Sequence, residues 1–560
     1  MTAEQPNATN AQDSTLDIAK RVYVYVIAAT GLFLLAIGLT NLLELVFTRV
    51  DEVWSDVDLL IGGEGDLRRQ LSIHVAMVLV ALPIWGAHWL LAERWASRDE
   101  RERQSRLRAL YLAAALALSM VYLATALRDA LYRLFIAVSS DTSLVYSRRG
   151  VPEALAFIAT AGGLWAYHAW VRRRDERAGA LPQRAQWPVR LYLYLAAFAG
   201  AMLLLSGVVG LLDVTVEALF PPSDEVVRAD RWWAASLSDS LSNALVGLLL
   251  WGTHWVYSLH IVTGEGWLTR SERRAVIRRS YLYIAAFTGT VLALVTAIQI
   301  LDMLFSRVLG VYSSADGDFL ARLISLLLRL VPFGVLWLYH QRQITHEAQA
   351  FGDAPLQIGV RRLYTYGVAL IGLAFAGIGL ARLLALVLAA LSSGNGSLTT
   401  SGDSWREQVS VFTAVTITGA ATWIWQWYRV QRWLEHDPAA EREATTRRVY
   451  LYSALGGAMI ALLGGLSVIL YRVLSALLNV SGRGDFVSDI SGPTGIAVVA
   501  LLFLLYHGLI LRSDLRTRPA AGPRPATQRL VLSGPPGADL DRVVTELRAG
   551  LPEGFALRRD

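Results

Sequence analysis

The chain has 560 residues, of which 54% are hydrophobic and only 18% are charged. Its mean hydropathy of +0.41 is too high for an ordinary soluble domain. The sequence contains no cysteine. This excludes disulfides, thiolate nucleophiles, cysteine-ligated zinc or iron–sulfur centres and covalently attached c-type haem.

The net charge of +6 comes from arginines that lie at the ends of long apolar runs. This pattern favours a membrane surface over nucleic acid as their partner. We therefore expect contacts with anionic lipid headgroups and no binding of nucleic acid. The composition as a whole predicts an all-α polytopic membrane protein.

The chain begins with a polar segment, residues 1–19, which predicts a disordered tail without a cleavable signal peptide. A first apolar run extends from Arg21 to about Phe47, long enough to cross roughly 30 Å of hydrocarbon. An acidic loop follows, and a second run over about 70–93 contains Trp85 and His88. After an arginine-rich link the cycle restarts at Tyr111.

This cycle recurs six times at a nearly constant spacing. A marker tyrosine opens each apolar pair, at Tyr23, Tyr111, Tyr192, Tyr281, Tyr364 and Tyr450. A polar residue closes each pair, at His88, His168, His254, His340, Gln426 and His507. It lies three residues after a tryptophan, or after Leu504 in the last pair. The fixed period predicts six helical hairpins, and therefore about 12 transmembrane helices.

The hairpins are of two kinds. A tryptophan follows the polar residue in the first, third and fifth, as in His254-Trp255, whereas a tyrosine precedes it in the second, fourth and sixth, as in Tyr339-His340. The strict alternation predicts three four-helix membrane units, at residues 20–180, 181–355 and 356–515. Because each hairpin crosses twice, the repeats are expected to be parallel, related by an axis along the membrane normal.

Arginines concentrate in the links that follow even-numbered runs, such as 94–108, whereas the opposite loops mix sparse arginine with acids. The positive-inside rule then places both termini in the cytoplasm of a bacterium, with the protein in its plasma membrane. After the last run, residues 516–527 form a Pro/Arg linker. Residues 528–560 predict a small cytoplasmic α/β tail, strand–helix–strand, that could dock a protein partner; its Gly534-Pro-Pro-Gly537 turn lacks the phosphate-loop lysine.

Two short motifs carry a family resemblance: Arg-x-Tyr-x-Tyr, as in Arg190 to Tyr194, and Trp-x-x-His, as in Trp165 to His168. With them, residues 20–515 resemble the uncharacterised bacterial membrane family known as domain of unknown function 5671. The resemblance implies a membrane domain of several helices and supplies no activity. The chain departs from the pattern at Gln426, in place of histidine, and at Leu504, in place of tryptophan.

The six polar residues, His88, His168, His254, His340, Gln426 and His507, form a candidate interfacial ring. They could bind haem, pass protons or grip an anionic headgroup. The alternative is an aromatic belt whose polar tips lie at headgroup level. Gln426 suits hydrogen bonding and suits metal ligation badly, so we favour the belt and expect no metal or cofactor.

Charges within the runs form a second candidate site. Arg329 lies in the middle of the eighth run, just before Val331-Pro332, and a central arginine requires a carboxylate or water. Its partner is expected to be Asp302 or Asp213. Function and structural pairing are equally compatible with such a pair.

Three functions follow as hypotheses. The first is a structural, interaction or lipid-contacting component of the bacterial plasma membrane, which lacks catalytic motifs and is not expected to be an enzyme. The second is a transporter or channel with a buried site centred on Arg329. The third is a redox protein that carries b-type haem.

Overall fold

The computed structural model describes residues 8–55, 64–139, 150–178, 186–221, 231–311, 318–392, 404–478, 486–516, 540–549 and 551. In these ranges all regular secondary structure is helical. Helices satisfy every backbone hydrogen bond within one segment, which is the requirement for a chain in lipid. The chain forms two compact parts, Met1–His507 and Gly508–Asp560.

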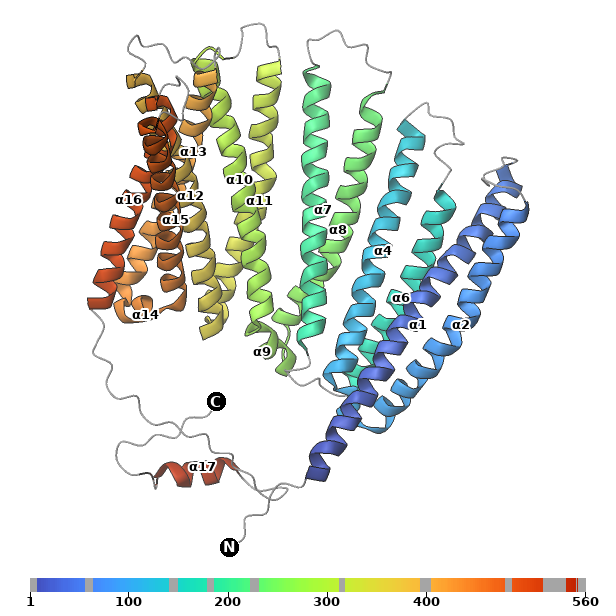
Figure 1. Ribbon diagram of the computed structural model, residues 1–560. Helices are drawn as coiled ribbons and strands as arrows, with labels where there is room; N and C mark the ends of the chain where they lie inside the picture. The colour runs from blue at the N-terminus through green and yellow to red at the C-terminus, as the bar shows by residue number, and fades with distance from the viewer. Residues whose placement is uncertain are drawn as a thin grey trace. The chain divides into compact units, whose positions relative to one another are not determined.

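Twelve helices of 28 residues or more make up the described part of the membrane region. They are α1 (Ala8–Ser55), α2 (Glu64–Arg98), α4 (Arg106–Ser139), α6 (Val151–Ala178), α7 (Trp187–Leu219), α8 (Trp233–Thr263), α10 (Val276–Val308), α11 (Asp318–Phe351), α12 (Pro355–Ser392), α13 (Ser404–His436), α15 (Thr445–Leu477) and α16 (Phe486–Arg516). Successive long helices run in opposite directions (Figure 1).

Eleven of these helices are long and apolar enough to cross a membrane. The exception is α13, which carries several threonines and the tryptophans Trp423, Trp425 and Trp427 in its central turns. These residues lower the mean hydropathy of α13, although it packs against the apolar helices α12 and α10.

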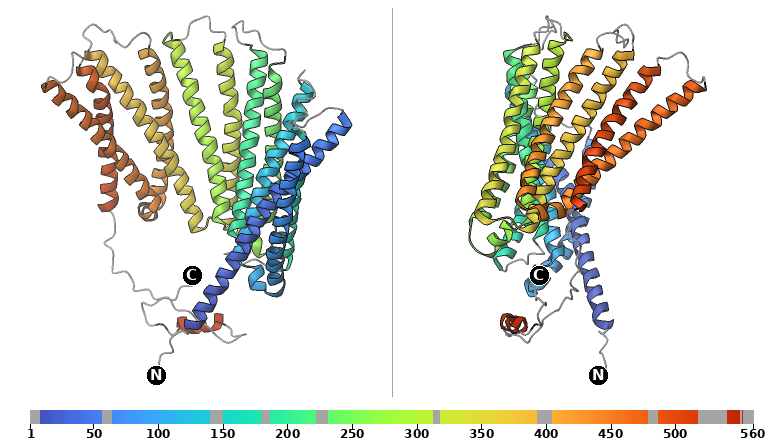
Figure 2. Two further views of the ribbon diagram at one scale, coloured as in Figure 1. Left: turned by 45° about the vertical axis from the view of Figure 1, so that its right-hand side comes forward. Right: turned by 90° about the vertical axis from the view of Figure 1, so that its left-hand side faces the viewer.

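Three short helices link pairs of long helices: α3 (Glu100–Arg103), α9 (Trp267–Arg273) and α14 (Pro438–Glu443). Asp99 caps the first of them and Asp437 caps the third, each accepting a hydrogen bond from a backbone N–H two or three residues on. In Figures 1 and 2, α9 and α14 lie at the same end of the long helices. The arginine-rich links are therefore short, ordered connections in the described residues.

Close helix pairs depend on glycines. Four pairs of glycines lie seven residues apart in sequence: Gly31 and Gly38, Gly200 and Gly207, Gly372 and Gly379, and Gly457 and Gly464. A Cβ at Gly200 of α7 would collide with the backbone of Trp251 in α8, and one at Gly372 of α12 would lie 2.7 Å from the nitrogen of Trp423 in α13. The fourth pair behaves differently, because nothing lies near Gly457 or Gly464 and the contact to α16 falls on Gly465 instead. Small residues let the backbones approach where packing supplies the attraction between membrane helices.

The segment for which we expected a disordered tail is partly helical, because α1 begins at Ala8. Extending an existing helix by one residue costs far less than nucleating a new one, so the long apolar helix can carry its polar N-terminal turns. In the tail after the last long helix, the structure describes one helix, α17 (Leu540–Ala549), where we expected the helix of a strand–helix–strand piece. The two expected strands, 529–533 and 555–558, lie outside the described residues.

Candidate functional site

The marker tyrosines and the tryptophans of the Trp-x-x-His motif meet in space. In five places the indole N–H donates to the hydroxyl of the tyrosine that opens the next hairpin: Trp85 to Tyr111 at 3.1 Å, Trp165 to Tyr192 at 2.8 Å, Trp251 to Tyr281 at 3.2 Å, Trp337 to Tyr364 at 3.2 Å and Trp423 to Tyr450 at 3.0 Å. Each bond therefore links one helix pair to the following pair. The 81–89-residue period of the sequence is the period of this contact.

The histidines continue these hydrogen-bond chains. In His254, Nδ1 lies 2.9 Å from the carbonyl oxygen of Leu250, which can only accept, so Nδ1 carries the proton. Its Nε2 then accepts from the hydroxyl of Tyr192 at 2.9 Å. The same pair of bonds recurs at His340 with Leu336 and Tyr281, and at His507 with Phe503 and Tyr450.

Three members of the predicted ring depart from this arrangement. His168 is fully buried and its Nδ1 bonds to Leu164, but its Nε2 has no hydrogen-bond partner among the described residues. Gln426 is buried and accepts a 3.3 Å hydrogen bond from Arg429. His88 is half-buried; its Nδ1 bonds to the carbonyl oxygen of Ile84 at 2.8 Å, and its ring contacts that of Tyr23, with centroids 5.6 Å apart.

Five of the six ring residues are therefore buried between helices. His254, His340 and His507 have both ring nitrogens engaged, so binding a haem iron would require each to give up a hydrogen bond. In the described residues there is also no group of three or more His, Asp or Glu side chains that could hold a metal ion.

The alternation between the two kinds of hairpin has a direct structural cause. The tryptophan that follows the polar residue, Trp89 or Trp255, donates to the tyrosine that precedes the next histidine, Tyr167 at 2.6 Å or Tyr339 at 2.5 Å. In the third unit the rings of Trp427 and Tyr506 lie 6.3 Å apart. Each tryptophan also packs on a marker tyrosine, at centroid distances of 4.9, 5.1 and 5.5 Å. One aromatic cluster thus joins two neighbouring hairpins in each of these three places.

Beside each aromatic cluster lies a buried ionic cluster that sequence reasoning missed. Its centre is an arginine that is only 1% exposed, at Arg108, Arg278 and Arg447. One acid of each cluster comes from the short linking helix, at Glu102, Glu272 and Glu441, which are 1–3% exposed. The sequence pattern alone favours topology and lipid contact as the roles of the arginines in these links, and the buried arginines depart from it.

The second unit gives the fullest version of the ionic cluster. Arg278 bonds to Glu347 through Nη2 at 2.6 Å and to the hydroxyl of Tyr194 through Nη1 at 3.1 Å. Tyr194 donates to Glu272 at 2.5 Å, and Arg190 pairs with Glu272 at 2.7 Å. Two arginines and two glutamates make the cluster neutral, which is what a buried group of charges requires.

The Arg-x-Tyr-x-Tyr motif is explained by the same cluster. Its arginine and its second tyrosine both bind the glutamate of the linking helix: Arg21 and Tyr25 bind Glu102, Arg190 and Tyr194 bind Glu272, and Arg362 and Tyr366 bind Glu441. A usable signal was present in the sequence, because Arg108, Arg278 and Arg447 each lie three residues before a marker tyrosine. The acids gave an equally regular one, since Glu102, Glu272 and Glu441 each lie six residues before that arginine.

Arg329 pairs with Asp213 and not with Asp302. Its Nε and Nη2 donate to the two carboxylate oxygens of Asp213 at 3.0 and 2.9 Å, and Ser325 donates to the same carboxylate at 2.7 Å. This bidentate pair joins α11 to α7 and is about one-third exposed. Asp302 instead accepts from Ser410 at 2.7 Å, a contact between α10 and α13.

The model of DUF5671, a domain of unknown function, matches residues 21–144, 190–335 and 362–502 of the chain. The three matches follow one another along the repeated helical units. No curated protein and no solved structure matches the chain. Together the three segments cover well over half of the sequence, and the protein therefore belongs to the DUF5671 family, whose activity is undetermined.

Proposed function

We propose that the protein is a structural and interaction component of the bacterial plasma membrane, built of three four-helix units from twelve crossings in six parallel hairpins. One observation carries this proposal: the repeated polar side chains hydrogen-bond to one another between helices. Trp165 and Tyr192, for example, connect the first unit to the second. Groups used in this way fix helices against each other, which is the requirement for a scaffold.

The same observation indicates where a partner would bind. The marker tyrosine receives a tryptophan from the preceding unit at Tyr192 and Tyr364. The marker tyrosine of the first unit, Tyr23, receives no tryptophan in the described residues; it is 58% exposed and lies beside the half-buried His88. We infer that this face takes a membrane helix of another protein that presents an indole N–H.

Quantitative co-purification tests the proposal. Three proteins are purified from membranes with isotope-labelled references: wild type, Tyr23→Ala/His88→Ala and the control Leu79→Ala. Leu79 is an exposed residue of α2. We expect at least one integral membrane protein to fall about tenfold in the double variant alone. An identical set of proteins in all three preparations would contradict the assignment.

The orientation belongs to the same proposal, with both termini and the arginine-rich links in the cytoplasm. Arg94, Arg98 and Arg106 are exposed and free of the buried ionic clusters, so they are suited to anionic lipid headgroups. The native chain has no cysteine, so a single engineered cysteine at Arg98 reports one side of the membrane. It should resist an impermeant maleimide in intact cells and react after permeabilisation; labelling in intact cells would reverse the orientation.

The tail supports a second docking element for a protein partner. In α17, Val543 and Leu547 are exposed and four residues apart, so they lie on one face of the helix. Deleting residues 525–560 should remove a co-purifying protein without changing the thermal stability of the membrane region. Unchanged co-purification would remove this element from the proposal.

A transporter or channel is the second candidate, and the Arg329–Asp213 pair is the observation that favours it. A partly exposed, bidentate pair between two membrane helices can open to admit an anionic or cationic solute. Flux in proteoliposomes that Arg329→Leu and Asp213→Asn both abolish would support transport. Absence of flux, together with no ligand-induced change in stability, would exclude transport and retain the scaffold function.

A further inference from the structure

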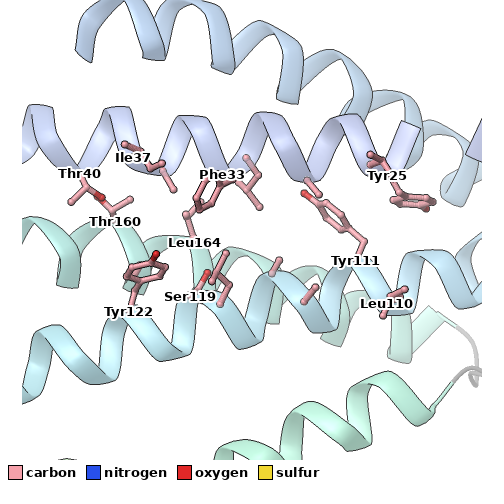
Figure 3. A pocket seen from close by; sticks show the side chains of 18 of the residues that line it. Tyr25, Phe33, Ile37, Thr40, Leu110, Tyr111, Ser119, Tyr122, Thr160 and Leu164 are labelled. Carbon is pink, nitrogen blue, oxygen red and sulfur yellow. The ribbon is translucent and has the colours of Figure 1, made fainter. Parts of the chain in front are cut away.

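A cavity of about 390 Å³ lies in the first unit between α1, α4 and α6 (Figure 3). Its volume is in the range of small-molecule sites, about 300–1,000 Å³. Most of its lining is aliphatic or aromatic, from residues such as Phe33, Ile37, Leu118 and Leu164. The cavity is separate from the Arg329–Asp213 pair, which lies in the second unit.

Comparison with the second unit explains why the cavity exists. Counting from the marker tyrosines Tyr23 and Tyr192, Ala29 corresponds to Phe198; counting from His168 and His340, Ala161 corresponds to Phe333. Phe333 is buried and Phe198 packs against the core cluster of the second unit. The first unit therefore lacks two phenyl rings at positions where the second unit fills its interior.

One polar group inside the cavity has no partner in the described residues. Thr160 is 5% exposed, and its Oγ1 makes no hydrogen bond there. Helical threonines elsewhere in the chain, such as Thr125 and Thr253, donate to a carbonyl oxygen four residues earlier. Thr160 therefore holds a donor that a bound oxygen atom could use.

The cavity is long, and the hydroxyl without a partner in the described residues, that of Thr160, lies near one end. Figure 3 shows Thr40 and Thr160 at one end and Tyr25 and Tyr111 at the other. The 15 residues of α1 from Tyr25 to Thr40 correspond to roughly 22 Å of helix at 1.5 Å per residue. One leaflet of the hydrocarbon core is about 15 Å thick, half of the roughly 30 Å total, so a full acyl chain fits this length.

The sides of the cavity open where the bilayer would lie. Val26, Phe33 and Leu118 line it and are 45–55% exposed within spans apolar enough for lipid. We propose that this cavity binds one acyl chain of a membrane phospholipid, whose ester carbonyl oxygen accepts a hydrogen bond from Thr160. The acyl chain of a phospholipid would fill the apolar length of the cavity, and its ester carbonyl oxygen would accept the hydrogen bond from Thr160.

Native mass spectrometry of the full chain in mild detergent, with lipid identification by fragmentation, tests the proposal. Ala29→Phe/Ala161→Phe fills the cavity with the side chains of the second unit. Leu90→Phe/Leu91→Phe adds two rings on α2, where both leucines are exposed, and serves as the control. We expect wild type and control to retain one phospholipid per chain and the filled variant to lose it about tenfold.

Thr160→Val, which is nearly isosteric, keeps the test decisive if the filled variant does not fold. It should lower phospholipid occupancy several-fold at an unchanged melting temperature. Equal occupancy in wild type and in folded Ala29→Phe/Ala161→Phe, or in Thr160→Val, would overturn the proposal. Recovery of an isoprenoid lipid in place of a phospholipid would also overturn it.

Discussion

The indole N–H of Trp165 donates a 2.8 Å hydrogen bond to the hydroxyl of Tyr192 and so connects two successive helical hairpins. Trp165 lies in α6 and Tyr192 in α7, and Tyr192 in turn donates to His254 in α8. Three helices are thus held by one chain of hydrogen bonds. In the described residues this connection is repeated, with small changes, along the whole membrane region.

Trp165→Phe should lower the free energy of unfolding, because the aromatic ring stays while the donor is lost. Interhelical hydrogen bonds in membranes contribute about 0.6 kcal/mol on average and at most about 1.7 kcal/mol. Reversible unfolding in SDS measures the difference. Trp170→Phe, at a tryptophan that is 57% exposed, is the control and should change little.

Arg278→Met should be strongly destabilising, since it leaves Glu347 buried without its cation. Removing one partner of a buried ion pair costs about 3–5 kcal/mol. Replacing both, as Arg278→Met/Glu347→Leu, should recover a large part of that loss. Thermal unfolding in detergent compares the three proteins; a double variant no more stable than Arg278→Met would contradict a paired role.

His340→Gln should be tolerated better than His340→Leu. Glutamine can still accept from the hydroxyl of Tyr281, whereas leucine leaves that buried hydroxyl without an acceptor, at a cost of about 1–3 kcal/mol. The chain itself carries Gln426 at an equivalent position. A visible haem band in the wild type that both variants abolish would assign the histidine to ligation instead.

Gly200→Ala should destabilise the protein by about 1–3 kcal/mol, because the new methyl group meets the backbone of Trp251. Gly464→Ala is the matched control. Nothing lies within 4 Å of its Cβ position, so the gain in helix propensity, about 0.5–1 kcal/mol, should dominate. Melting temperatures that move in the same direction for both variants would be evidence against the close α7–α8 contact.

The helical class, the repeat and the family could be predicted because each follows from features that recur periodically along the sequence. The marker tyrosines and the apolar runs recur at fixed intervals, and membrane helices need no long-range pairing to satisfy their backbone. The alternation of Trp255 and Tyr339 about the polar residue is visible in the sequence, although the hydrogen bond that explains it required both helices in space.

The ionic clusters could not be predicted in the same way. Glu272 and Arg278 are near in sequence, but Glu347 lies 69 residues from Arg278 and on another helix. The position three residues before a marker tyrosine distinguishes Arg278 from the exposed Arg274, but the acid that pairs with Arg278 is apparent only when the helices are packed. For the same reason the sequence left Asp213 and Asp302 as equal partners of Arg329.

A double-mutant cycle between Trp165 and Tyr192 tests most directly whether the repeated polar side chains hold the units together. The free energy of unfolding in SDS is measured for wild type, Trp165→Phe, Tyr192→Phe and the double variant. The structure predicts a favourable coupling of about 0.6–1.7 kcal/mol between the two side chains. A coupling of zero would show that the two changes act independently, and would contradict the interlocked scaffold.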